Sequence, residues 1–129
     1  MAKKIPIFPD QAPVPIGPYS PAVRFGNLLF LSGAIALDPK TGQLAQNNME
    51  EEVTCVMRNI EAILRHAGLS WEHVLKTTIY LTHMQHFETV NRIYGSFFKD
   101  NYPARETVQV AALPRGARVE ISVVAGFPE

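Results

Sequence analysis

Residues 102–125 read Tyr102-Pro-Ala-Arg-Glu-Thr-Val-Gln-Val-Ala-Ala-Leu-Pro-Arg-Gly-Ala-Arg-Val-Glu-Ile-Ser-Val-Val-Ala125 and predict two β-strands joined by a turn at residues 113–116. Strand side chains alternate between two faces. The apolar faces are expected to carry Val108, Val110 and Ala112 on the first strand, and Val119, Ile121 and Val123 on the second. The opposite faces carry Arg105, Thr107 and Gln109, and Arg118, Glu120 and Ser122. An arginine and a glutamate away from the core indicate either a solvated surface or a site.

The rest of the chain supplies the other elements of an α+β domain. Residues 1–18 hold five prolines and predict an extended arm, followed by short strands at 22–25 and 28–32. Apolar spacing predicts helices over residues 48–68, with Asn48 as N-cap, and over 85–98, on either side of a strand at 74–81. The order β-β-α-β-α-β-β predicts a mixed sheet with both helices on one face.

Composition excludes several classes of protein. The 129 residues are 47% hydrophobic and 19% charged, which predicts a single globular domain over residues 1–129. The formal net charge of zero argues against a nucleic-acid partner, because such domains carry a basic face. Cys55 is the only cysteine, so an intrachain disulfide and a multi-thiolate zinc site are excluded. Without a signal peptide or a membrane-spanning apolar run, we expect a cytoplasmic protein with no membrane partner.

The sheet face away from the helices predicts self-association. We expect it to carry Ala111, Leu113, Thr107 and Val124, which together are neither polar nor apolar. An exposed mixed patch of this kind usually marks an interface. The sequence therefore predicts an oligomer whose sheets pack around a shared core.

Seven stretches, spread over most of the chain, together form a specific pattern. They are Ile16-Gly-Pro-Tyr-Ser20, Leu31-Ser-Gly33, Val74-Leu-Lys-Thr-Thr78, Phe87-Glu-Thr-Val-Asn-Arg-Ile-Tyr94, Pro103-Ala-Arg105, Val110-Ala-Ala-Leu-Pro114 and Val119-Glu-Ile121. In their order and spacing the chain resembles the Rid (YjgF) family of reactive intermediate imine deaminases.

The resemblance implies a chorismate-mutase-like fold, a homotrimer with three clefts between subunits, and hydrolysis of 2-imino acids such as 2-iminobutyrate and 2-iminopropanoate to 2-oxo acids and ammonia. It implies that Arg105 binds the substrate carboxylate and that Glu120 handles the water, with no metal or organic cofactor. It further implies a pocket shaped by Tyr19, Ser32, Gly33, Phe87, Asn91 and Thr107.

Four positions depart from the family pattern. Thr107 stands where many members have cysteine, Ala34 and Pro21 stand where glutamine is frequent, and Ser122 replaces a frequent second acid. Arg105 and Glu120 are retained, so we expect these changes to affect pocket shape and substrate range. Thr107 also removes any thiol chemistry at that position.

Other interpretations stay open. An arginine on a strand, such as Arg105, is more often a surface or ion-pair residue than a ligand-binding one. Glu120 is also typical of a solvated charge or of a partner for Arg118 or Lys76. His83 and His86 lack a further ligand, so we expect no metal site. Alternative functions are a ribonuclease that inhibits translation, and a non-catalytic small-carboxylate binder or stress holdase. Glu120 argues against a pure carboxylate binder, which gains nothing from a nearby negative charge.

Hairpin geometry bears on where a site could form. If the last two strands pair about residues 114–116, Glu120 lies near Ala111 and Arg105 lies on the order of 20 Å further along. One small substrate does not span that distance within a chain. Either the strand register differs, or Arg105 of one subunit meets Glu120 of another, and we expect the second. We also expect Arg105 to face away from the helices.

Overall fold

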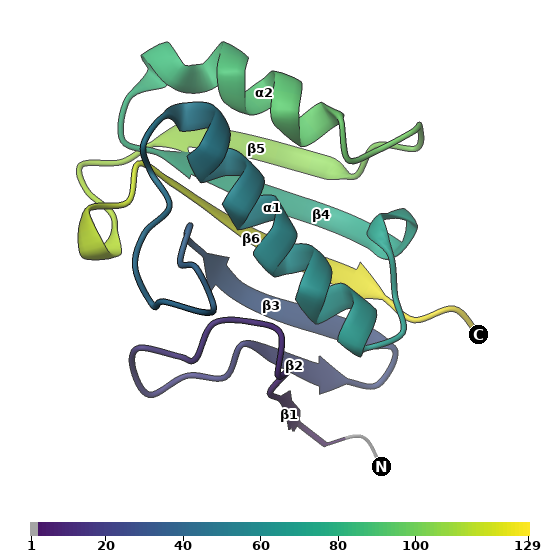
Figure 1. Ribbon diagram of the computed structural model, residues 1–129. Coiled ribbons are helices and arrows are strands. Elements are labelled where there is room, and N and C mark those ends of the chain that lie inside the picture. The colour runs from purple at the N-terminus through teal and green to yellow at the C-terminus, as the bar shows by residue number, and fades with distance from the viewer. Residues whose placement is uncertain (1–2) are drawn as a thin grey trace.

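The computed structural model of the chain describes residues 3–129 (Figure 1). Within these residues, six strands form one mixed sheet in the order β1-β2-β3-β6-β4-β5, and two helices complete an α+β fold. The strands are β1 (Ile5–Ile7), β2 (Ala22–Phe25), β3 (Leu28–Ala34), β4 (Val74–Leu81), β5 (Ala104–Gln109) and β6 (Val119–Gly126). The helices are α1 (Met49–His66) and α2 (Phe87–Gly95), and the 3-10 turns are η1 (Trp71–His73), η2 (Met84–His86) and η3 (Pro114–Gly116).

The first helix is confirmed at both ends. The Asn48 side chain accepts a hydrogen bond from the Glu51 N–H at 2.8 Å, and Gly68 adopts a left-handed φ of +79° just after α1. The second helix is shorter than predicted. The separate turn η2 precedes α2, and α2 ends at Gly95 instead of continuing to Phe98.

The predicted hairpin of the last two strands is wrong. β5 pairs in parallel with β4, and β6 pairs antiparallel with both β4 and β3, so β4 lies between β5 and β6 (Figure 1). The connection leaves the sheet edge at β5, turns through η3 and re-enters at the centre. Arg115 and Gly116 take positive φ values of 61° and 76° in that turn. It therefore works as a crossover instead of a hairpin loop.

The proline-rich arm also differs from expectation. Part of it forms the edge strand β1, which pairs with β2 through Ile5 and Arg24. Strand β3 continues to Ala34, and its pairing with β6 shifts between Leu31 and Ala34. Ser32 and Gly33 of β3 there oppose the single residue Ser122 of β6, which is a β-bulge.

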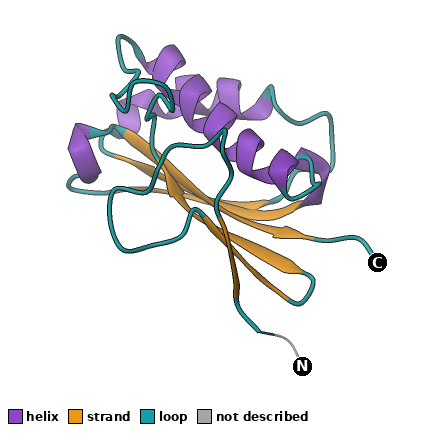
Figure 2. Ribbon diagram, turned by 60° about the horizontal axis from the view of Figure 1, so that its bottom comes forward, coloured by secondary structure: helices purple, strands orange, loops and turns teal. Residues whose placement is uncertain are grey.

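Both helices cover the same face of the sheet (Figure 2). The core between the layers contains Val53, Val56, Met57, Ile60 and Leu64 of α1, Val90 of α2, and Leu29, Ile79, Leu81 and Ile121 of the sheet. The uncovered face carries partly exposed side chains that include Phe30 and Val108. The predicted two-layer arrangement is confirmed.

The predicted faces of β5 are reversed. Arg105 and Thr107 pair in register with Thr77 and Ile79, whose side chains are buried beneath the helices. Arg105 bonds a residue of α2, whereas Val108 lies on the uncovered face and is 41% exposed. Alternation shows which side chains of a strand share a face, but not which of the two faces lies under the helices. On this edge strand Arg105 and Thr107 turn toward the helix layer, whereas Glu106 pairs with Lys76 on the uncovered face.

Candidate active site

The sequence-predicted site residues divide between two pockets. The first, here called the Glu120 pocket, measures about 330 Å³ and is lined by Ile16, Tyr19, Ser32, Gly33, Ile35, Pro114 and Glu120. The second, the Arg105 pocket, measures about 370 Å³ and is lined by Asn91, Tyr94, Gly95, Tyr102, Pro103 and Arg105. Phe87 and Thr107 lie beside the Arg105 pocket, on α2 and β5.

The β3 bulge shapes the Glu120 pocket. A Cβ atom on Gly33 would collide with the Glu120 carboxylate, so only glycine permits this approach. The Ser32 hydroxyl donates to the carbonyl of Ser20 at 2.7 Å, which ties the bulge to the arm. The Tyr19 hydroxyl accepts from the Ile16 N–H at 3.3 Å and holds the arm over the pocket.

Glu120 has no ion-pair partner among residues 3–129. The two cations considered from the sequence pair elsewhere, Arg118 with Glu52 and Lys76 with Glu106. Burial alone raises the pKa of the Glu120 carboxyl above its ordinary value. A half-buried carboxylate without a partner is suited to exchange a proton with a bound molecule.

One stripe of helix α2 lies beside the Arg105 side chain. Phe87, Asn91 and Tyr94 are spaced i, i+4, i+7 and therefore share one stripe of α2. Arg105 donates from Nη1 to the Asn91 amide oxygen at 2.6 Å. The guanidinium carbon lies 5.2 Å from the ring centroid of Tyr94 and 5.8 Å from that of Phe87. Arg105 is exposed and lines the pocket of about 370 Å³.

Thr107 presents an unsatisfied hydroxyl. Its Oγ1 is buried and has no hydrogen-bond partner among the described residues. It lies two residues from Arg105 on the same side of β5. A buried hydroxyl without a partner usually bonds a water or a bound group.

Arg105 and Glu120 do not meet within one chain. Arg105 pairs with Thr77 and Glu120 with Tyr80, so they lie three residues apart along β4 and on either side of it. Standard strand dimensions place their Cα atoms about 14 Å apart, closer than the hairpin geometry predicted. The side chains also point to opposite faces of the sheet, which separates them further.

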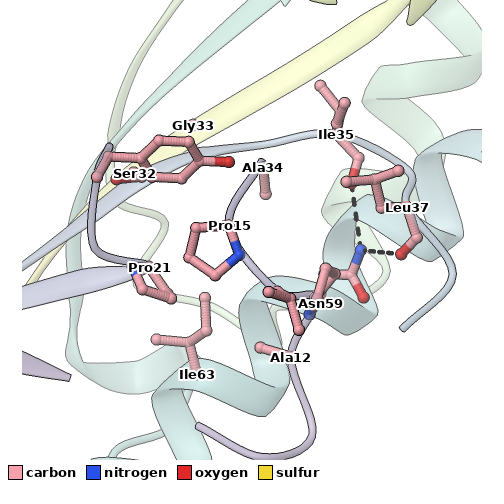
Figure 3. A pocket seen from close by; sticks show the side chains of 13 residues that line it. Ala12, Pro15, Pro21, Ser32, Gly33, Ala34, Ile35, Leu37, Asn59 and Ile63 are labelled. Carbon is pink, nitrogen blue, oxygen red and sulfur yellow. Dashed lines mark hydrogen bonds between the residues drawn. The ribbon is translucent and has the colours of Figure 1, made fainter. Parts of the chain in front are cut away.

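A third cavity of about 50 Å³ lies on the helix side of the bulge (Figure 3). The Asn59 carboxamide, 4% exposed, donates there to the carbonyls of Ile35 and Leu37 at 3.2 and 2.8 Å. It fixes the chain that leaves β3. We missed Asn59 from the sequence, although its spacing from Val56 and Ile63 places it on the apolar stripe of α1.

A second buried polar residue of α1, Glu52, was also missed. Its carboxylate is fully buried and accepts from the backbone N–H and the Nε–H of Arg118, each at 2.7 Å. Arg118 also donates to the carbonyl of Gln46 at 2.9 Å. These bonds anchor the start of β6 two residues before Glu120.

Residues 3–129 contain no cluster of three or more potential metal ligands, and none of their helices is long and apolar enough to cross a membrane.

Comparison with known proteins identifies the family. Residues 9–127 match the family model described as Endoribonuclease L-PSP. The chain is 46% identical over 115 residues to human 2-iminobutanoate/2-iminopropanoate deaminase, covering 89% of this chain and 84% of the human protein. The chain belongs to the Rid family, which is also called YjgF or RutC.

Solved structures of Rid proteins share this fold closely. A Rid family protein of Yersinia pestis, YyfA, is 44% identical with a TM-score of 0.94, over 97% of this chain and 100% of that one. E. coli TdcF, solved with bound serine, is 35% identical with a TM-score of 0.92, over 96% of this chain and 99% of that one.

Proposed function

We propose that this Rid protein hydrolyses 2-imino acids, with 2-iminobutanoate and 2-iminopropanoate as substrates, to 2-oxo acids and ammonia. The observation that carries the proposal is the contrast between the two pockets, one offering a held guanidinium and the other a desolvated carboxylate without a partner. The name of the human relative supports the substrate class, and the serine bound to TdcF supports a small ligand with a carboxylate.

Arg105 binds the substrate carboxylate. A guanidinium presents a planar fork of N–H donors that grips two carboxylate oxygens at once. Asn91 occupies one donor and leaves the others for the substrate. Thr107 lies on the same side of the strand, and its buried hydroxyl shapes the floor beside Arg105.

Glu120 activates the water. Its carboxylate accepts a proton as the water oxygen bonds to the imine carbon, which gives a carbinolamine. The same carboxyl returns the proton to the nitrogen. The Glu120 carboxylate then takes the hydroxyl proton of the carbinolamine and delivers it to the nitrogen as the carbon–nitrogen bond breaks, so the hydroxyl oxygen becomes the carbonyl of the 2-oxo acid and ammonia leaves. One water is consumed for each imine, and no electrons are transferred.

The complete site forms between two copies of the chain. Arg105 and Glu120 lie on opposite faces of one sheet, so a substrate that touches both takes them from different chains. Repeated head-to-tail contacts around a symmetry axis produce one such cleft for each subunit. We propose the homotrimer that the family resemblance implies as the active form.

The ribonuclease alternative draws support from the description of the matching family model. The charge of the chain weighs against it, because 12 acidic residues balance 12 basic ones. Phosphate-backbone binding relies on an excess of clustered Lys and Arg. A negative charge without a partner in the Glu120 pocket would also repel a phosphate.

The test is a coupled assay in which threonine dehydratase or an amino-acid oxidase generates the imine and semicarbazide traps it. We expect the protein to reduce semicarbazone formation while 2-oxo acid and ammonia appear faster. Unchanged semicarbazone formation in the presence of folded protein would contradict the proposal. Degradation of added RNA by the same preparation would favour the ribonuclease instead.

A further inference from the structure

Arg105 needs support to act as a binding group. A free arginine side chain populates many rotamers, and a ligand that captures it has to immobilise them. Asn91 restrains one end through the 2.6 Å bond to Nη1. One hydrogen bond at an exposed position leaves the plane of the guanidinium free to turn, so a second restraint is required.

Tyr94 supplies a surface for that plane. Its ring centroid lies 5.2 Å from the guanidinium carbon, within the range of a cation–π contact. Phe87 lies further away, at 5.8 Å, and its side chain is more exposed. The Tyr94 ring is therefore the closer and more rigid of the two aromatic neighbours.

The Tyr94 ring is itself fixed. Tyr94 is 4% exposed, and its hydroxyl shares a 2.8 Å hydrogen bond with the hydroxyl of Thr77, which is 1% exposed. Phe98 packs against the ring with centroids 5.0 Å apart. Burial raises the pKa of the Tyr94 phenol above its ordinary value.

Thr77 lies directly beside Arg105 in the sheet, because the two residues are register partners on β4 and β5. Three contacts therefore form a closed loop: strand pairing joins Arg105 to Thr77, the hydroxyl bond joins Thr77 to Tyr94, and the ring returns to Arg105.

We infer that Tyr94, locked by Thr77, is a positioning residue that orients the Arg105 guanidinium for the substrate carboxylate. The inference rests on the proposed role of Arg105. Because Tyr94 acts on a group that binds substrate and transition state alike, its loss raises KM and leaves kcat nearly unchanged.

Binding of 2-oxobutanoate, measured by calorimetry, tests the inference alongside imine turnover. Tyr94→Leu removes the ring, and we expect about a tenfold weaker Kd. Tyr94→Phe keeps the ring and loses only the lock, so about a threefold loss is expected, equal to that of Thr77→Val. The double variant should bind no worse than either single one, since both remove the same bond.

Val90→Ala is the matched control, because Val90 is 1% exposed in the same helix and belongs to the core. We expect it to lower Tm without changing Kd. Equal Kd values for folded Tyr94→Leu and wild type would overturn the inference, as would an equal loss in Val90→Ala. If wild type itself bound no 2-oxobutanoate, the proposed role of Arg105 would fail and this inference with it.

Discussion

At the scale of single residues, Arg105 and Glu120 differ in how their charges are handled. Arg105 has an amide oxygen and two aromatic rings around its guanidinium. Glu120 has a glycine backbone against its carboxylate, and burial raises its pKa. The first environment holds a permanent cation in place, and the second makes an anion easier to protonate. These are the properties that a carboxylate binder and a proton acceptor respectively require.

Replacement of Arg105 by alanine should raise KM and severely reduce kcat/KM for deamination, with little loss of folding. The side chain turns toward α2 but is exposed, so its removal leaves no core cavity. The lost charge-assisted contact is worth on the order of 2–4 kcal/mol of substrate binding. Steady-state kinetics and thermal melts measure both effects. Arg92→Ala removes an arginine from the same region whose partner is the exposed Glu50, and should leave the rate unchanged. Wild-type clearance of 2-iminobutanoate by Arg105→Ala would refute the assignment.

Glu120→Gln should lower turnover far more than it weakens 2-oxobutanoate binding. Glutamine keeps the shape beside Gly33 but does not accept the proton of the water. General-base catalysis typically contributes about 10²–10⁴-fold, and the loss in kcat should fall in that range. Parallel measurement of kcat and of the 2-oxobutanoate Kd decides the question. Equal losses in rate and affinity would indicate a structural role for Glu120 instead.

The same variant should also change the pH dependence of stability. A carboxyl whose pKa is raised by folding favours the native state most at low pH, and this stabilisation is lost as pH rises through the raised pKa. Glu120→Gln should therefore melt at a higher temperature than wild type at pH 7. The difference should shrink toward pH 4. A stability difference that is constant with pH would show that desolvation of the charge is not the cause.

At the scale of elements, the sequence predicted what each segment becomes better than what it pairs with. The apolar spacing and Asn48 cap of α1 are local signals, and the structure confirms that helix. The pairing partner of β6 on this side is β4, which ends nearly forty residues before β6 begins. Sequence neighbours make an obvious hairpin, and nothing local reveals that β4 enters between β5 and β6. The predicted sheet face of Arg105 rested on that hairpin and was wrong as well.

The ion pair between α1 and β6 should contribute strongly to stability. Glu52 is fully buried, so Glu52→Ala leaves the Arg118 guanidinium without its partner, at a cost of about 3–5 kcal/mol. Glu50→Ala, in the same helix turn, breaks only the exposed pair with Arg92 and should cost about 0–1 kcal/mol. Urea unfolding of the two variants measures the difference. Similar urea midpoints for Glu52→Ala and Glu50→Ala would contradict a large contribution of the buried ion pair to stability.

At the scale of the whole molecule, one face of the sheet has no covering layer within this chain. The helices cover one face of the sheet, and Phe30 and Val108 remain 43% and 41% exposed on the other. Sequence patterns predicted the family, because its motifs are contiguous, and the roles of Arg105 and Glu120 stay predictions. They did not predict how the pockets divide, because that depends on which sheet face each residue occupies. In the proposed homotrimer, a second copy covers this face and contributes the other charged residue of the site.

Complementation between two inactive variants tests this composite site most directly. Arg105→Ala and Glu120→Gln chains are mixed in equal amounts, unfolded, refolded together and assayed for 2-iminobutanoate hydrolysis. Random assembly gives intact Arg105 and intact Glu120 in about a quarter of the clefts between chains, so about a quarter of the refolded wild-type activity should return. A mixture as inactive as either variant alone, while wild type recovers fully from the same treatment, would contradict a site shared between chains.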